Sequence, residues 1–162
     1  MSEIPRPRRR ARRLLCLLLL CMGVLLTAGW VAQPFLKERD LARALEGVTR
    51  LRVRTGGACH RRLPEERTLF ETADPEEIRQ LASAVRFSPH LFDLGCQCCG
   101  LPTLEFYRAD SLVLALSLHH GKAVRRIDGP WENAPLTNES GAAMKRWLAR
   151  HGISEASPKA YR

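Results

Sequence analysis

Three cysteines lie within four consecutive residues, and two adjacent histidines follow them in the chain. The thiols belong to Cys96, Cys98 and Cys99, and the imidazoles to His119 and His120. Thiolate sulfur and imidazole nitrogen are the ligands that zinc and copper(I) prefer, whereas magnesium and calcium prefer oxygen. The residue types therefore predict a zinc or copper site formed by these side chains.

A fourth cysteine, Cys59, lies next to His60 and shortly after the pair Gly56-Gly57. The glycine pair is expected to end a strand. Cys59 joins the predicted metal site if that strand ends at the same edge of the sheet as the other three cysteines, and the sequence leaves this condition open.

The same cysteines have two other interpretations. Four cysteines outside the hydrophobic segment allow two disulfides in an oxidising compartment. Neighbours such as Cys98 and Cys99 pair only in strained geometry, so a single bridge from Cys59 to the cluster, with two spare thiols, is the simpler version. A redox-active thiol is the third interpretation.

Alternating side chains predict the strands that position this cluster. Residues 48–55 alternate between apolar and basic side chains, and residues 67–72 form a second short strand paired with them. Residues 103–107 and 112–119 form the clearest hairpin, and residues 124–127 add one more strand.

The apolar residues of the 103–119 hairpin define its register. Pairing Phe106 with Leu114 and Leu104 with Leu116 places the large apolar side chains on one face, whereas a shift by one residue mixes the two faces. The first register is therefore predicted.

This register also predicts which of the two histidines lies nearer to the cysteines. With Arg108 closing the hairpin opposite Leu112, Gly100 lies across from His120. We therefore favour His120 over His119 as the ring that approaches the thiols.

Two amphipathic helices complete the domain. Asp74 is placed as the cap of a helix over residues 75–86, with Glu77 positioned to close a capping box. Thr137 caps a last helix that stops at Gly152. The order ββαβββα predicts an α+β domain in which the helices pack on an antiparallel sheet.

Two of these motifs carry a resemblance. The run Thr72 to Ile78, followed later by Leu104-Glu105-Phe106-Tyr107, resembles a pattern of small exported, membrane-anchored bacterial α+β domains, in which a capped helix precedes an "EFY" hairpin. The resemblance implies an architecture and a surface location, and it carries over no activity.

Residues 14–36 contain no charged side chain. These 23 residues, at ~1.5 Å per helical residue, exceed the ~30 Å hydrocarbon core of a bilayer. Trp30 falls where an interfacial aromatic belongs, which favours an uncleaved anchor. The competing interpretation is a signal peptide cleaved after Leu26-Thr27-Ala28.

An arginine-rich tail precedes this segment. Six arginines lie among residues 1–13 and account for most of the net charge of +9. The positive-inside rule places them in the cytoplasm and the domain on the far side, as a single-pass membrane protein. This topological role explains the charge, so no nucleic-acid partner is expected.

The chain therefore divides into five predicted parts: a basic tail (1–13), a transmembrane helix (14–36), a linker (37–46), an exported domain (47–154) and a loose tail (155–162). Residues 37–45 of the linker are expected to form a short charged helix that continues the membrane helix or lies on the surface. Two functions are consistent with this chain. One is a membrane-tethered domain that binds zinc or copper, and the other is a metal-free, disulfide-stapled domain that binds an envelope protein. No nucleophile elbow, phosphate loop or paired-histidine helix is present, which disfavours an enzyme.

Overall fold

The structure is a computed structural model that describes residues 8–56, 67–90, 100–127, 129 and 133–153. The chain forms two compact units, Met1–Gln33 and Pro34–Arg162. Helix α1 (Arg8–Leu45) contributes to both.

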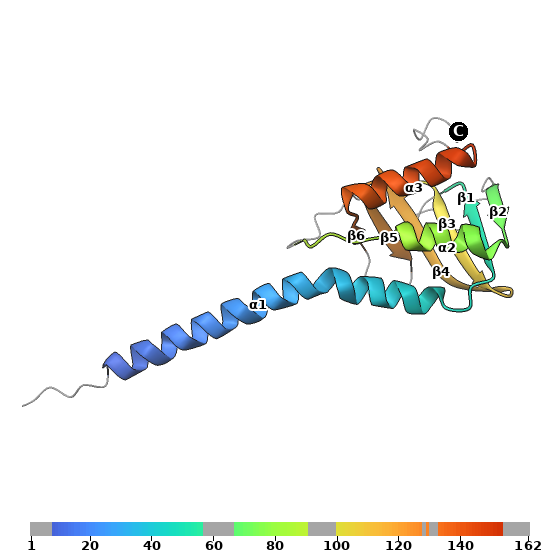
Figure 1. Ribbon diagram of the computed structural model, residues 1–162. Helices are drawn as coiled ribbons and strands as arrows, with labels where there is room; N and C mark the ends of the chain where they lie inside the picture. The colour runs from blue at the N-terminus through green and yellow to red at the C-terminus, as the bar shows by residue number, and fades with distance from the viewer. Residues whose placement is uncertain (1–7, 57–66, 91–99, 128, 130–132, 154–162) are drawn as a thin grey trace, which may run out of the picture. The chain divides into compact units, whose positions relative to one another are not determined.

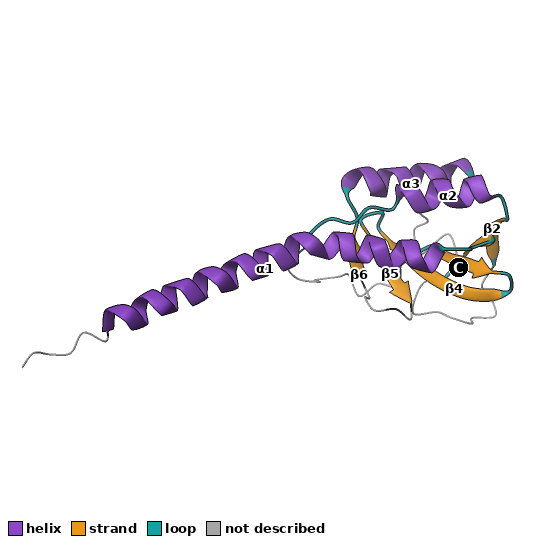
Figure 2. Cartoon of the chain, turned by 60° about the horizontal axis from the view of Figure 1, so that its bottom comes forward, coloured by secondary structure: helices purple, strands orange, loops and turns teal. Residues whose placement is uncertain are grey.

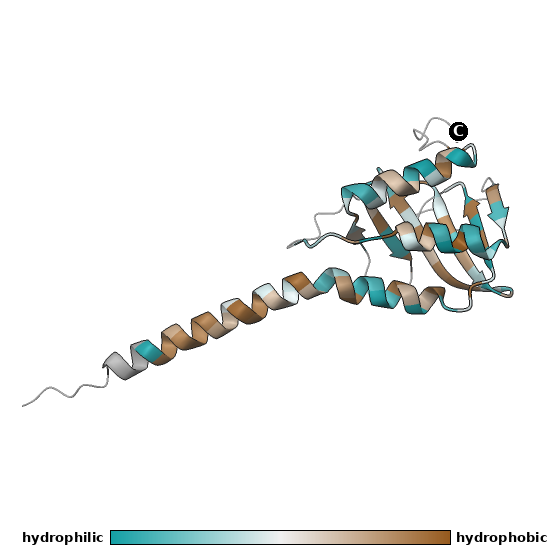
Figure 3. Cartoon of the chain, in the orientation of Figure 1, coloured by the Kyte–Doolittle hydropathy of each residue, from teal (hydrophilic) through white to brown (hydrophobic). Residues whose placement is uncertain are grey.

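The first unit contains the N-terminal part of α1, which Figure 3 colours mostly hydrophobic after its basic start. Its leucines from Leu14 to Leu26 are each more than half exposed. An 18-residue window of this helix has a mean hydropathy of 2.5, and none of it is buried. This helix is long and apolar enough to cross a membrane.

The second unit is built on one antiparallel sheet of six strands in the order β2-β1-β3-β4-β5-β6. The strands are β1 (Arg50–Arg54), β2 (Thr68–Thr72), β3 (Thr103–Arg108), β4 (Ser111–His119), β5 (Ala123–Ile127) and β6 (Asn133–Pro135). The predicted α+β class with an antiparallel sheet is confirmed. The predicted order lacks β6, because a strand of three residues is too short to show alternation.

The predicted core of the β3–β4 hairpin register is confirmed. Phe106 faces Leu114 and Leu104 faces Leu116. The predicted closing pair of Arg108 with Leu112 is wrong, because the register shifts after Phe106 and Arg108 faces Ser111. The shift lets the hairpin close through the tight turn at Ala109, which has a φ of 50°.

Helices α2 (Pro75–Ala84) and α3 (Asn138–Arg150) lie side by side over one face of the sheet, as Figures 1 and 2 show. The caps Asp74 and Thr137 form as predicted, since each side chain accepts a backbone N–H of its helix. The predicted capping box is replaced by a contact between helices, because Glu77 Oε2 accepts a hydrogen bond from Trp147 Nε1 at 2.9 Å. The last turn of α3 ends as predicted at Gly152, which has a φ of 70°.

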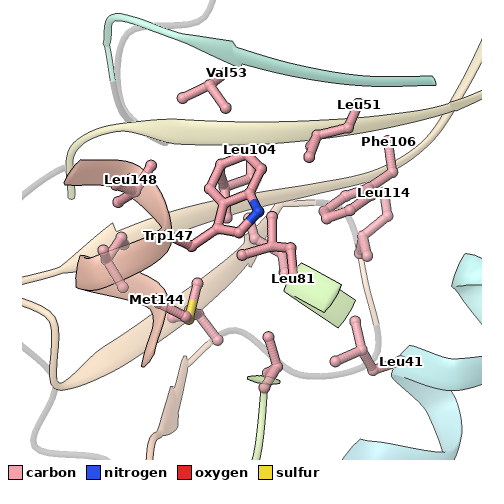
Figure 4. Close-up of a cluster of buried hydrophobic side chains, with 14 of the residues drawn as sticks. Leu41, Leu51, Val53, Leu81, Leu104, Phe106, Leu114, Met144, Trp147 and Leu148 are labelled. Carbon is pink, nitrogen blue, oxygen red and sulfur yellow. The ribbon is translucent and has the colours of Figure 1, made fainter. Parts of the chain in front are cut away.

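The hydrophobic core lies between these helices and the sheet. Figure 4 shows its central side chains, which come from β1, β3, β4 and all three helices: Leu41, Leu51, Val53, Leu81, Leu104, Phe106, Leu114, Met144, Trp147 and Leu148.

The last turns of α1 belong to this second unit. Leu41 is 3% exposed within the core. Glu38 Oε1 accepts a hydrogen bond from the Phe87 backbone at 3.0 Å, and Lys37 Nζ donates to the Asn133 carbonyl at 3.0 Å. Residues 37–45, within the predicted linker 37–46, are helical as expected and pack on the domain.

Candidate functional site

The face of the sheet opposite α2 and α3 carries polar side chains, yet it is buried. The alternation of β1, β3 and β4 places these residues on one side, away from the apolar core. Five of them are less than a tenth exposed: Arg54, Thr103, Glu105, Ser117 and His119. Ala115 lies buried among them. A buried polar face must satisfy its own hydrogen bonds and charges, so its contacts identify the candidate site.

Glu105 on β3 is the centre of one half of this face. Arg54 Nε donates to Glu105 Oε1 at 2.6 Å, and Arg52 Nε donates to Oε2 at 2.8 Å. The Tyr107 hydroxyl donates to the same Oε2 at 2.7 Å. Both carboxylate oxygens are therefore bound, and two guanidinium groups balance the one buried negative charge.

These contacts determine the charge of Glu105. Burial alone would raise its pKa, but the hydrogen bonds from Tyr107, Arg54 and Arg52 outweigh burial and hold the pKa below its usual value. Burial, aided by the neighbouring carboxylate, raises the pKa of Tyr107. Glu105 is thus ionised at neutral pH, and Tyr107 is a neutral donor.

His119 lies in the other half of the face. It ends β4, is 4% exposed and follows Ser117 on the same side of the strand. A Cβ atom placed on Gly100 would lie 2.5 Å from His119 Nε2 and 2.9 Å from the Ser117 Cβ. The ring therefore occupies the space that a side chain at position 100 would need.

The prediction that His120 faces Gly100 is wrong. His120 is exposed and has a φ of 51°, so the chain turns away from the sheet at that residue. That prediction required regular strand pairing to extend past Leu118. The paired residues of β3 and β4 end at Ser117, and beyond it Leu118 makes backbone hydrogen bonds with Leu101 and Pro102.

Burial lowers the pKa of His119 to about 4, and the positive charges of Arg125 and His120 add to the effect. The imidazole is therefore neutral at neutral pH. Neutral imidazole is the form that binds metal ions, so its protonation state fits the predicted role.

Gly56 and Gly100, the described residues nearest to the cysteines in the sequence, both lie at this end of the sheet. β1 pairs antiparallel with β3, so that Arg54 lies opposite Thr103. Thr103 Oγ1 donates to the Gly56 carbonyl at 2.8 Å. Gly56, three residues before Cys59, and Gly100, next to Cys99, therefore both lie beside the row that contains Thr103 and Ser117.

The predicted ligands Cys59, Cys96, Cys98 and Cys99 lie outside the described residues, and only His119 and His120 of the predicted site are described. Within the described part of the chain, no three His, Cys, Asp or Glu side chains are grouped as metal ligands. The predicted metal site stays a prediction.

The Glu105 network was not predicted from the sequence. The arginines of β1 were assigned to the polar side of a half-buried strand, although Arg54 is 5% exposed. The available signal was Glu105 itself, a single acid in a hydrophobic strand whose neighbouring strand carries arginine at every second position.

No known protein family, curated protein or solved structure matches this chain. Its function is therefore argued from the chemistry of its own residues.

The contact of His119 with Gly100 can be tested with a pair of glycine variants. Gly100 and Gly152 both have a positive φ, but a Cβ atom meets His119 only at Gly100 and meets nothing within 4 Å at Gly152. Gly100→Ala should therefore lower the unfolding free energy by about 2 kcal/mol more than Gly152→Ala, the usual cost of overpacking. Denaturant titration of the full chain in detergent measures both. Equal costs would contradict the contact, and adding His119→Ala should recover part of the loss.

The Glu105 network predicts a loss of stability in acid. The folded pKa of Glu105 lies below the unfolded value of 4.5, so its contribution is complete above that pH and is lost as the pH falls through the folded pKa. Glu105→Gln should cost about 3 kcal/mol at pH 7, because it leaves a buried guanidinium uncompensated. It should also flatten the acid limb of a stability–pH curve.

Glu71→Gln is the matched control, because Glu71 pairs with Arg50 at the surface, where its side chain is 41% exposed. Its cost should stay below about 1 kcal/mol. Equal costs of the two variants would show that burial of the Glu105 charge is unimportant for stability.

Proposed function

We propose that this protein is a membrane-anchored domain on the non-cytoplasmic side of a membrane, where it binds zinc or copper through its cysteine cluster and His119. The observation that carries the proposal is the position of the His119 ring against Gly100, the residue bonded directly to Cys99. His119 takes the place that the sequence argument gave to His120.

The donor set fits the metal. The His119 ring packs against the backbone of Gly100, which follows Cys99 directly in the sequence. Cys96 and Cys99 also have the Cys-x-x-Cys spacing that is common among zinc ligands. The buried, neutral imidazole of His119 supplies a nitrogen donor on a rigid strand end, and Cys59 can add a further thiolate, since Gly56 lies at the same end of the sheet.

A metal bound here would stabilise the fold. Thiolate and imidazole ligation contributes directly to the folding free energy in small domains. The site would join the segment after β1 to the segment before β3, whose described ends, Gly56 and Gly100, lie beside the row that contains Thr103 and Ser117.

Anchoring and orientation are supported by different residues. The apolar part of α1 is long enough to span a bilayer. Six arginines precede it, whereas Lys37, Arg39 and Arg43 after it alternate with acidic residues. The positive-inside rule therefore favours a cytoplasmic N-terminus and an exported domain.

The second candidate function is a metal-free domain that presents its surface to an envelope protein, with disulfides from Cys59 to the cluster. An exported location supports it, because disulfides persist in oxidising compartments. The Cys96–Cys99 spacing is also found in thiol redox proteins, which supports a third candidate.

Metal analysis combined with a thiol count separates these functions. The full chain, purified from its membrane without added metal, should contain close to one zinc or copper ion per chain. His119→Gln should lose most of the metal and lower the melting temperature, because structural binding contributes to folding. His120→Asn, which changes the adjacent exposed histidine and tolerates its positive φ, should keep the metal. Wild-type protein without metal and with all four cysteines oxidised would refute the proposal and support the disulfide-stapled domain.

Topology is tested with a reporter fused after Arg162. The reporter should be active only outside the cytoplasm, and the mature protein should keep its N-terminus and resist carbonate extraction. Replacing the five arginines between Arg8 and Arg13 by glutamine should reduce the correctly oriented fraction, whereas Arg146→Gln and Arg150→Gln should not. Cytoplasmic activity of the unmodified fusion would refute the orientation.

A further inference from the structure

An open groove lies between the last turns of α1 and helix α2. Its volume is about 580 Å³. Residues of α1 between Glu38 and Leu45, with Glu46 just after the helix, form one wall, and residues of α2 with the segment that follows it, from Arg79 to Arg86, form the other. Both walls belong to the second compact unit.

The groove combines an apolar lining with positive charge. Its apolar residues come from both walls: Leu41, Ala42, Leu45, Ala82 and Val85. Its charged residues are four arginines and two glutamates: Arg39, Arg43, Arg79, Arg86, Glu38 and Glu46. Glu38 already accepts a hydrogen bond from the Phe87 backbone, which directs one of the two carboxylates away from a ligand role.

The four arginines lie at the surface. Arg79 pairs with Glu76, a neighbour on its own helix, and Arg86 Nη1 donates to a backbone carbonyl at 2.8 Å. Each of these contacts uses part of a guanidinium that has five N–H donors. The groove therefore offers several forked donors to an anion, the geometry that suits phosphate oxygens.

The position of the groove along α1 indicates the source of the anion. Leu36 is the last residue of the uncharged segment, and α1 stays helical to Leu45. At ~1.5 Å per residue, Arg39 and Arg43 lie about 5 and 10 Å past Leu36 along the helix. The headgroup layer on each side of a bilayer is roughly 5–8 Å thick, so these arginines are at or just beyond its depth.

We propose that this groove binds an anionic phospholipid of the bilayer that anchors the chain, with the arginines on its phosphate-bearing headgroup and the start of an acyl chain against the apolar lining. The proposal rests on the membrane anchoring proposed above. The positive charge of the arginines favours an anionic headgroup. The apolar lining of the groove favours a lipid over a soluble acidic peptide, because only the lipid has an acyl chain to place against it.

The test uses the full chain in neutral detergent, titrated with short-chain phosphatidylglycerol and, separately, with phosphatidylcholine of the same chain length. Phosphatidylglycerol should raise the melting temperature in a saturable manner, and phosphatidylcholine should not. The double variant Arg39→Gln/Arg43→Gln should bind phosphatidylglycerol about 30-fold more weakly, the effect of removing two basic side chains at a membrane surface.

The double variant Arg146→Gln/Arg150→Gln is the matched control. It also removes two exposed arginines four residues apart on one helix, but these residues lie on α3, outside the groove. It should bind phosphatidylglycerol like the wild type. Equal binding of the two lipids, or an equal loss in the two double variants, would overturn the proposal, as would binding of a polyglutamate peptide in place of phosphatidylglycerol.

Carbonate extraction of the wild type distinguishes a failure of the groove proposal from a failure of the proposed membrane anchoring. A chain that carbonate releases from membranes would refute the anchor itself. A chain that stays in the membrane but does not distinguish the two lipids would refute the groove proposal alone.

Discussion

The burial of β3 on both faces is the constraint on which the second unit depends. One face contributes Leu104 and Phe106 to the core under the helices, and the other contributes Thr103 and Glu105 to a buried polar layer. A strand buried on both sides usually carries apolar residues throughout. Here a carboxylate is buried instead, so β1 must supply arginines at the positions that face it. The alternation of β1 thus follows from the charge on β3 as much as from the core.

The polar layer also determines what the ends of the sheet can do. In its Glu105 half, arginine and tyrosine donors occupy both carboxylate oxygens, so the carboxylate has little capacity left to bind a ligand. Such a network is suited to holding strands in register. The His119 half differs, since it ends at a neutral imidazole packed on a glycine. Gly100 lets the backbone approach the ring with no intervening side chain. The two halves of this face therefore have different roles. The Glu105 network holds the central strands together, and the candidate metal ligand His119 lies at the edge.

The fold was predictable where a single residue pattern determined it. Apolar alternation specified the pairing of Phe106 with Leu114, and the caps Asp74 and Thr137 specified two helix starts. Prediction failed where a distant partner competed with a local one. Glu77 binds Trp147 of α3 instead of closing its own helix, and the hairpin admits a register shift to close through a tight turn. The choice between His119 and His120 failed for the same reason, because it depended on where the ladder ends and not on side-chain type.

The last turns of helix α1 are part of the second unit. Its uncharged segment ends at Leu36, and the very next residue, Lys37, already donates to the Asn133 carbonyl of the domain. Asp40 pairs with Arg126 and Leu41 enters the core, so the turns that follow the apolar segment are held by charge, hydrogen bonding and apolar burial together. These same turns, together with α2, form the walls of the basic groove, so the residues that pack α1 on the domain also shape that groove.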